Sequence, residues 1–264
     1  MTQFVDVDGI RLHVRLDGPE AAPPLVLANS LGTDLTMWDP QVQALARTHR
    51  LIRFDTRGHG KSAVPPGPYA VPALARDVLG LVGRLGYDRV DFCGLSLGGM
   101  IGLYLARTAP DRIGRVALCN TAALIGPATV WDTRIKTVNE TGMAAIAAGV
   151  IDRWFTKGFQ ERDPAAVARV RDVMLGTDPA GYTAACAAVR DMDQRAGLAE
   201  VRCPALVIVG EHDLATTPAQ GEELAAGIAG ARLVRLDAAH ISNIEQPAAF
   251  TAAVTEFFGG STHG

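Results

Sequence analysis

The feature that most constrains this chain is a serine flanked by two glycines, in the pattern Gly94-x-Ser96-x-Gly98. A short apolar stretch precedes the pattern, and residues 100–106 continue it with the periodicity of a helix. This arrangement predicts a buried strand, a tight turn that carries the serine, and a helix that begins directly behind it. Side chains two residues before and after the serine would collide with neighbouring backbone, so glycine is needed there. The free N–H groups at the start of the helix can then stabilise an oxyanion beside the serine hydroxyl.

The size and composition indicate one large globular domain, or one domain with an inserted piece. The chain has 264 residues, of which 48% are hydrophobic and 20% charged, and its net charge is −3. A slightly negative chain without a basic cluster argues against nucleic-acid and anionic-membrane partners. It shows no signal peptide and no apolar run of transmembrane length, so we expect a cytoplasmic protein. The cysteines lack C-x-x-C spacing and lie in apolar surroundings, which predicts buried, reduced thiols at Cys93, Cys119, Cys186 and Cys203.

Short apolar strands alternate with helices along the chain, which predicts a mostly parallel sheet with helices on both faces. Residues around Asp8-Gly9 alternate between apolar and polar, as in a hairpin with a two-residue turn. The later strands are too continuously apolar to have one solvated face. We expect eight strands: at 4–7, 10–16, 24–28, 50–54, directly before Gly94, and at 116–119, 205–209 and 233–236. Helices are expected at about 38–46, 71–85, after Ser96 and at about 247–258.

The character of the sequence changes between about residues 121 and 198. This segment is rich in alanine, has helical periodicity without a clear strand, and contains Trp131 and Trp154. A helical segment between two strands of one sheet predicts an insertion. We therefore expect residues 121–198 to form a helical lid over a core made of residues 1–120 and 199–264.

Three polar residues follow predicted strands at the edge where ligands bind in open α/β sheets. Ser96 follows the strand before Gly94, Asp213 follows the strand at 205–209, and His240 follows the strand at 233–236. Serine, aspartate and histidine in this chain order are expected of an α/β-hydrolase. We predict that Ser96 is the nucleophile, that His240 is the general base, and that Asp213 orients the imidazole.

Other polar residues near the strand ends are weaker candidates for catalytic residues. Glu211 is a rival acid that we expect to face away from the site. Asn120 occupies a place where some hydrolases keep their acid, but its amide is neutral and cannot do that work. His59 lies in the turn at 57–62 and is interpreted as structural. The histidines show no ligand spacing such as H-E-x-x-H, so we expect no metal and no organic cofactor.

The oxyanion hole should consist of two backbone N–H groups. One belongs to Leu97, the residue after the predicted nucleophile. The other lies in the loop after the strand at 24–28, where Asn29-Ser30-Leu31-Gly32 aligns with a common His-Gly-x-x loop. This alignment places the second donor at Leu31.

Seven stretches together carry a closer resemblance than the fold alone. They are residues 29–33, 53–62, 92–99, 119–122, 131–135, 153–155 and 238–243, among which the Asn-Ser-Leu-Gly loop and the lid pieces are the more specific. These stretches are similar to the 3-oxoadipate enol-lactonases, a family of α/β-hydrolases. The resemblance implies a serine hydrolase that opens the enol-lactone of 3-oxoadipate with water, in the β-ketoadipate pathway of aromatic-acid breakdown. It also implies a small lactone substrate that carries a free carboxylate.

The predicted lid offers candidates for binding that carboxylate. Trp131 and Arg134 stand three residues apart, which places them on one face of a helix. Arg134 would pair with the carboxylate and Trp131 would cover the ring. The alternative is an arginine in solvent and a tryptophan that packs within the lid. Arg190 is a second cation, which we expect to pair with acidic residues of the lid itself.

Three other functions remain open on these residues. A general carboxylesterase or perhydrolase would favour apolar acyl groups and would not need Arg134. A C–C bond hydrolase would apply the same triad to ring-fission products. A ligand receptor on the same fold is a third possibility, although a receptor need not retain Ser96, Asp213 and His240 together.

Overall fold

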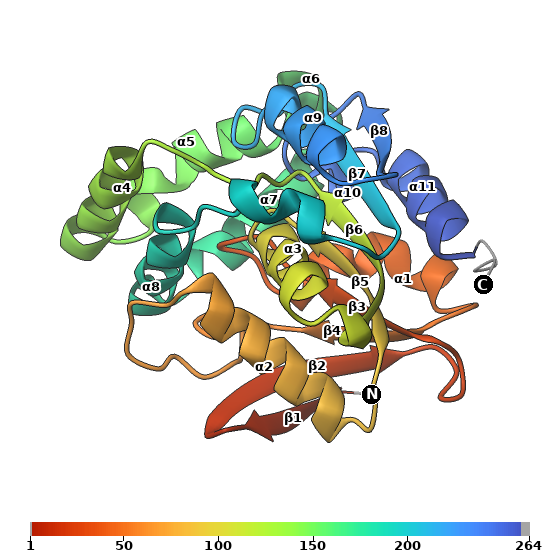
Figure 1. The fold of residues 1–264 in the computed structure, drawn as a ribbon. Helices are drawn as coiled ribbons and strands as arrows, with labels where there is room; N and C mark the ends of the chain where they lie inside the picture. The colour runs from red at the N-terminus through yellow and green to blue at the C-terminus, as the bar shows by residue number, and fades with distance from the viewer. Residues whose placement is uncertain (1, 260–264) are drawn as a thin grey trace.

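The computed structural model describes residues 2–259, which fold around one eight-stranded sheet (Figure 1). The order of strands across the sheet is β1-β2-β4-β3-β5-β6-β7-β8. The pairs β1–β2 and β2–β4 are antiparallel, and all other neighbours are parallel. The predicted mostly parallel, eight-stranded sheet is thereby confirmed. The strands are β1 (Thr2–Val7), β2 (Ile10–Asp17), β3 (Pro24–Ala28), β4 (Arg50–Phe54), β5 (Val90–Leu95), β6 (Ile113–Cys119), β7 (Ala205–Gly210) and β8 (Arg232–Leu236).

Helices cover both faces of the sheet. On one face α3 packs against β5 and β6 with α2 beside it, and on the other α1 packs against α11. Within residues 2–259, the helices are too short or too polar to span a bilayer. The helices of the core are α1 (Asp39–Leu45), α2 (Val71–Arg84), α3 (Leu97–Thr108), α9 (Pro218–Gly227), α10 (Ser242–Glu245) and α11 (Pro247–Gly259), with short 3₁₀ turns η1 (Leu35–Trp38), η2 (Pro110–Arg112) and η3 (Arg195–Glu200).

Five helices lie in the sequence between β6 and β7, and we call them the helical insertion. Figure 1 shows α4, α5 and α8 gathered at one side of the molecule, away from β8 and α11. An Asp or Thr side chain caps the start of three of these helices, as Asp163 and Asp178 do, and a proline occupies the first turn of two of them. The five helices are α4 (Ala128–Thr141), α5 (Ala144–Trp154), α6 (Lys157–Arg162), α7 (Pro164–Leu175) and α8 (Pro179–Arg190).

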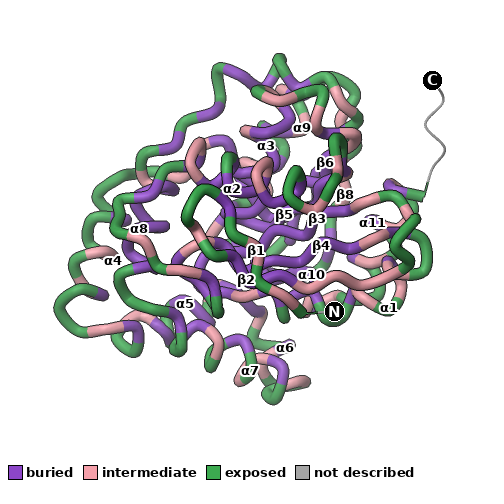
Figure 2. Tube along the Cα trace, turned by 90° about the horizontal axis from the view of Figure 1, so that it is seen from below, coloured by how far each residue is buried: buried purple, intermediate pink, exposed green. Residues whose placement is uncertain are grey.

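The core lies along the central strands. Strands β3 and β4 are buried at every position except the first. Strand β1 instead alternates between exposed and partly buried residues until its last residue (Figure 2). This difference explains why continuous apolar runs predicted the central strands and alternation predicted the edge hairpin. The register aligns Ala28 of β3 with Gly94 of β5, and Leu95 of β5 with Cys119 of β6. The loops that follow these three strands therefore begin side by side.

Two expectations from the sequence need correction. Strand β6 begins at Ile113 and not at residue 116, because Gly114 and Arg115 interrupt its apolar pattern while the backbone is already extended. Arg115 is tied there by an ion pair with Asp91 of the neighbouring strand, at 2.7 Å. Cys203 is only partly buried, whereas the other three cysteines are buried, and all four are free thiols.

The glycines around Ser96 are required by close backbone contacts. A Cβ atom on Gly94 would lie 2.2 Å from the Gly98 carbonyl oxygen, and one on Gly98 would lie 2.1 Å from the Ala28 carbonyl oxygen. Ser96 itself has a φ of 56°, which a non-glycine residue rarely adopts. The helix α3 is therefore pressed against β3 and β5, and the turn between them projects the serine at the end of the sheet.

We expect Gly98→Ala to destabilise the fold by about 3 kcal/mol or more, because its methyl group meets backbone that cannot move aside. Gly83→Ala is the matched control: it lies on the exposed face of α2, and its Cβ would meet nothing within 4 Å. The control should instead stabilise the protein by about 0.5–1 kcal/mol, because alanine favours the helix. Urea unfolding of both variants measures the difference. Equal effects would show that the close contact at Gly98 can relax.

Candidate active site

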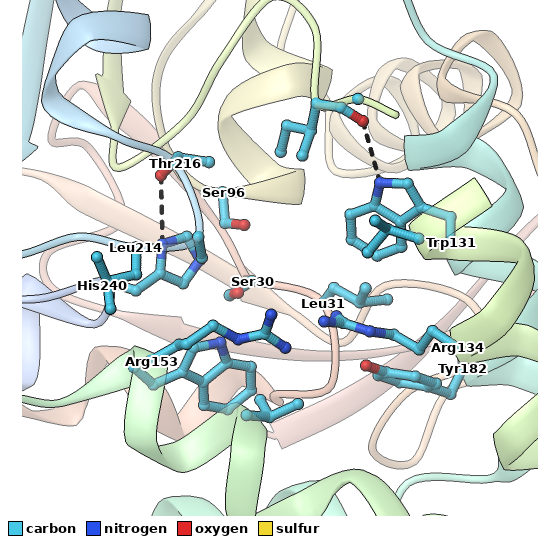
Figure 3. Close-up of a pocket in the computed structure, with 16 residues that line it drawn as sticks. Ser30, Leu31, Ser96, Trp131, Arg134, Arg153, Tyr182, Leu214, Thr216 and His240 are labelled. Atoms are coloured by element: carbon cyan, nitrogen blue, oxygen red, sulfur yellow. Dashed lines mark hydrogen bonds between the residues drawn. The ribbon is translucent and has the colours of Figure 1, made fainter. Parts of the chain in front are cut away.

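A cavity of about 150 Å³ lies between the carboxyl ends of the strands and the helical insertion. The core contributes Ser96 from the turn after β5, His240 from the loop after β8, and Leu31 from the loop after β3. The insertion contributes residues of α4, α5 and α8, which face the core residues across the cavity (Figure 3). The structure therefore brings together residues that are more than 200 positions apart in the sequence.

Ser96 is held at the start of α3 by contacts with the next strand. Its N–H donates to the Cys119 carbonyl oxygen at 2.9 Å, and its carbonyl oxygen accepts from the Thr121 hydroxyl at 2.7 Å. These bonds fix the strained backbone of the serine, which is 7% exposed and lines the cavity. A hydroxyl in this position can attack a carbonyl carbon once a base takes its proton.

His240 and Asp213 form a buried pair. The distance from Nδ1 of His240 to Oδ2 of Asp213 is 2.8 Å. A carboxylate can only accept, so Nδ1 carries the proton and Nε2 is left with a free lone pair. The ring of Trp154, on α5, stacks against the imidazole at 6.4 Å between centroids. The imidazole is thus oriented from one edge by the core and from one face by the insertion.

Asp213 is an ionised carboxylate held by many donors. Its Oδ1 accepts from the N–H groups of Ala215 and Thr216 at 2.8 and 2.9 Å, and its Oδ2 accepts from the Thr216 hydroxyl at 2.7 Å. Burial raises the pKa of Asp213, but the electrostatic interaction with His240 and the hydrogen bonds from His240, the Thr216 N–H and Asn120 outweigh it, so the pKa lies below its ordinary value. The carboxylate therefore stays charged at neutral pH and can stabilise a protonated imidazole.

Asn120 donates a hydrogen bond to this pair, a role that the sequence did not reveal. Its amide nitrogen donates to Oδ2 of Asp213 and to the Ala239 carbonyl oxygen, both at 3.1 Å. Its amide oxygen accepts from the Ser242 hydroxyl at 2.5 Å. A neutral amide at the end of β6 thus serves as a donor to the acid at the end of β7. The available signal was its position directly after a strand, next to the serine loop.

The two predicted oxyanion donors lie in two segments that a backbone hydrogen bond joins at the strand ends. Leu97 begins α3, and Leu31 lies in the loop after β3, which the Gly98 N–H anchors by donating to the Asn29 carbonyl oxygen at 3.0 Å. Among residues 2–259, no protein acceptor takes a hydrogen bond from the N–H of Leu31 or Leu97. Two free amides next to a serine can hold an oxyanion.

Trp131 and Arg134 both line the cavity from α4, and the guanidinium of Arg134 lies 4.8 Å from the Trp131 ring centroid. The indole N–H donates to the Ile125 carbonyl oxygen at 3.0 Å, which fixes the ring. Arg190 is on the surface, where it pairs with Asp132 at 2.8 Å and Asp191 at 2.7 Å. The expected pairing of Arg190 with acids of the insertion is confirmed.

Arg153 is a cavity residue that the sequence analysis did not single out. Its guanidinium, on α5, points toward that of Arg134 on α4 (Figure 3). Burial and the charge of Arg134 lower the pKa of Arg153 below its ordinary value. In the described part of the chain, neither arginine forms an ion pair. Two unpaired cations facing each other favour an anionic ligand between them. Its sequence signal was its place in the stretch 153–155, one of the lid pieces that carry the family resemblance.

The remaining candidates lie outside the cavity lining. Glu211 is exposed, as expected. His59 is buried, and its Nδ1 lies 3.2 Å from the Arg57 carbonyl oxygen. Burial lowers its pKa to about 4. No cluster of three or more metal-binding side chains occurs within residues 2–259.

Known proteins can now be compared with this fold and site. The family model of the alpha/beta hydrolase fold matches residues 23–141. The chain is 40% identical to 3-oxoadipate enol-lactonase 2 of Acinetobacter baylyi, over 93% of this chain and 92% of that protein. The crystal structure of the enol-lactonase from Burkholderia xenovorans LB400 is 52% identical, with a TM-score of 0.97, over 98% of this chain and all of that one.

The chain therefore belongs to the alpha/beta hydrolases, the class that its fold and its serine turn define. Within that class it belongs to the family of the 3-oxoadipate enol-lactonases. A more distant relative, the putative carbamate hydrolase RutD of Rhizobium rhizogenes, is 32% identical over 92% of this chain and 94% of that protein. The family resemblance read from the sequence is confirmed.

His59 should make stability depend on pH. Its folded-state pKa of about 4 lies below the ordinary value of 6.5, so the unfolded chain takes up a proton first as the pH falls. Stability should therefore be complete above pH 6.5 and decline toward pH 4, by up to about 3 kcal/mol from this group. The difference in unfolding free energy between wild type and His59→Gln, referenced to pH 8, should change by this amount over that window. Parallel curves would show that the pKa of His59 is the same in the folded and unfolded states.

Proposed function

We propose that this protein hydrolyses the enol-lactone of 3-oxoadipate to 3-oxoadipate. The observation that carries the proposal is a serine at a strained turn, sharing a cavity with a histidine–aspartate pair and two unpaired arginines. The histidine–aspartate pair supplies the general base that ester hydrolysis needs, and the arginines supply the positive charge that binds an anionic substrate. Membership of the enol-lactonase family supports the same reaction.

In the proposed mechanism, the Ser96 hydroxyl attacks the ring carbonyl carbon while Nε2 of His240 takes its proton. The N–H groups of Leu31 and Leu97 hold the resulting oxyanion, and Asp213 stabilises the imidazolium. Collapse of the tetrahedral intermediate breaks the ring C–O bond and releases an enolate oxygen. This oxygen is a good leaving group and stays attached to the acyl chain. It takes from His240 the proton that came from Ser96, and the resulting enol tautomerises to the ketone.

The second half of the reaction uses the same groups. Water gives a proton to His240 and attacks the acyl carbon on Ser96, and the serine oxygen leaves with a proton from His240. The product is a keto diacid with one more negative charge than the lactone. No step needs a group other than the side chains and amides of the site.

We propose that residues 121–198 act as a lid that selects the substrate by charge. Arg134 would pair with the free carboxylate of the lactone, with Arg153 as the second cation, and Trp131 would cover the ring. The guanidinium groups point into the cavity from two helices, so a carboxylate between them would replace their mutual repulsion with charge-assisted hydrogen bonds.

Ser96→Ala tests the serine mechanism. The variant should keep the circular dichroism spectrum of the parent and lose about a millionfold in kcat, because no other group can form the acyl intermediate. The parent should be assayed against the enol-lactone of 3-oxoadipate, a dienelactone, a p-nitrophenyl ester and a ring-fission diketone. Preference for the ester or the diketone would favour the carboxylesterase or the C–C bond hydrolase, and no turnover at all would favour a receptor.

Arg134→Ala tests the carboxylate site. A charge-assisted contact in a partly dry cavity stabilises binding by roughly 2–4 kcal/mol, so kcat/KM for the anionic lactone should fall about 30- to 1,000-fold. A neutral p-nitrophenyl ester should be hydrolysed nearly as fast as by the parent, since the triad is untouched. Arg190→Ala, which removes a surface arginine already paired with acids, is the matched control. Equal losses on both substrates would indicate damage to the lid, and no loss on either would remove Arg134 from the site.

A further inference from the structure

The loop that carries His240 is fastened on both sides of the histidine, to α10 before it and to the helical insertion after it. Before it, the Ala239 N–H donates to Oε2 of Glu245 at 2.9 Å. After it, the Ile241 N–H donates to the Trp154 carbonyl oxygen at 3.1 Å, at the last residue of α5. The ring of Trp154 also stacks on the imidazole. The segment from Ala239 to Ile241 is thus held between α10 and the end of α5.

Glu245 joins these two parts. Besides Ala239, its carboxylate accepts from the Thr156 hydroxyl and from the Thr156 N–H, at 3.3 and 3.4 Å to its two oxygens. Thr156 follows α5 and caps the start of α6. Glu245 is 3% exposed, and no cation within residues 2–259 forms an ion pair with it. A buried carboxylate held only by neutral donors is stable while all of those donors stay in place.

This network gives the insertion a direct hold on the catalytic geometry. Asp213 fixes the rotation of the imidazole but does not fix the backbone from which the side chain hangs. The backbone bonds at Ala239 and Ile241 do, and they run to Glu245 and to the end of α5. Arg153, which points into the cavity, directly precedes Trp154 on the same helix. Movement at the end of α5 would therefore move the histidine loop as well.

We propose that Glu245 is a positioning residue that locks the end of α5 to the His240 loop and so holds the imidazole in place for proton transfer with Ser96. This inference rests on the proposed serine mechanism, but it does not depend on which ester or lactone is the substrate. A purely structural role would change stability and leave the rate of the folded enzyme unchanged.

The test compares three substitutions. Glu245→Gln keeps the size of the side chain but places an amide NH₂ group against one of the N–H donors. Thr156→Val removes the hydroxyl donor from the insertion side and leaves the bond from Ala239 intact. Glu161→Gln is the matched control, because it makes the same chemical change at an exposed site on neighbouring α6. Each variant is assayed on a neutral p-nitrophenyl ester well below its melting temperature.

We expect Glu245→Gln to lower kcat about tenfold or more with KM changed less than about threefold, and Thr156→Val to lower kcat by a smaller factor. The double variant should be no worse than Glu245→Gln alone, because both changes break one network. In the NMR spectrum of histidine-labelled protein, the Nδ1 proton that His240 shares with Asp213 should exchange faster in Glu245→Gln. It should be unchanged in Glu161→Gln.

Two results would overturn the proposal: parental kcat in folded Glu245→Gln, or an unchanged Nδ1 proton signal in that variant. If Glu245→Gln does not fold, a parental kcat in folded Thr156→Val overturns it in the same way. Failure of the proposed function is distinguishable, because it would appear as turnover in Ser96→Ala or as no lactone hydrolysis by the parent. The NMR measurement reports on His240 in either case.

Discussion

The rest of the site depends on how closely α3 approaches β3 and β5. A methyl group on Gly98 would lie 2.1 Å from the Ala28 carbonyl oxygen, and one on Gly94 would lie 2.2 Å from the Gly98 carbonyl oxygen. This approach places the Leu97 N–H next to the loop after β3 and forces Ser96 into a φ of 56°. Hydrogen bonds to the next strand compensate for that strained conformation. The positions of the proposed nucleophile and of both proposed oxyanion donors thus have one steric cause.

Asp213 and His240, the proposed acid and base, are held in place by a second set of constraints, which are polar contacts. Asp213 accepts hydrogen bonds from two backbone amides and from the Thr216 hydroxyl, so its orientation does not depend on His240 alone. Asn120 links Asp213 to the backbone of the histidine loop. A buried network of this kind is stable only when every member has its partner, which also makes it rigid. Proton transfer benefits from that rigidity, because the reacting groups lose little further freedom.

The helical insertion contributes both specificity and order. It places two guanidinium groups in the cavity without a carboxylate partner in the described residues, and it places the Trp154 ring against His240. The first arrangement is unfavourable in the free protein and favourable when an anion binds, and in the proposed function it selects substrates by charge. The second connects the insertion to the His240 loop, and Glu245 accepts hydrogen bonds from Thr156 on one side and from Ala239 on the other. Binding and catalysis therefore share the helix α5.

The order of strands and helices, the serine turn and the three strand-end residues all follow from the sequence by itself. These features are local: a glycine-flanked serine, apolar runs of five or six residues, and an acid or a histidine directly after a run. Local sterics and periodicity decide them, so they are visible in one stretch of chain at a time. The early start of β6 was missed for the same reason, because Gly114 and Arg115 hide an extended backbone.

Only the tertiary structure decided which residues of the insertion face the cavity and what holds His240. The sequence favoured Arg134 over Arg190, but only the structure shows that Arg134 lines the cavity while Arg190 pairs with two acids on the surface. The sequence says little about the roles of Arg153, Asn120 and Glu245, because their partners lie up to 122 residues away. Such contacts depend on how helices pack against the sheet, and periodicity along one helix cannot specify that packing.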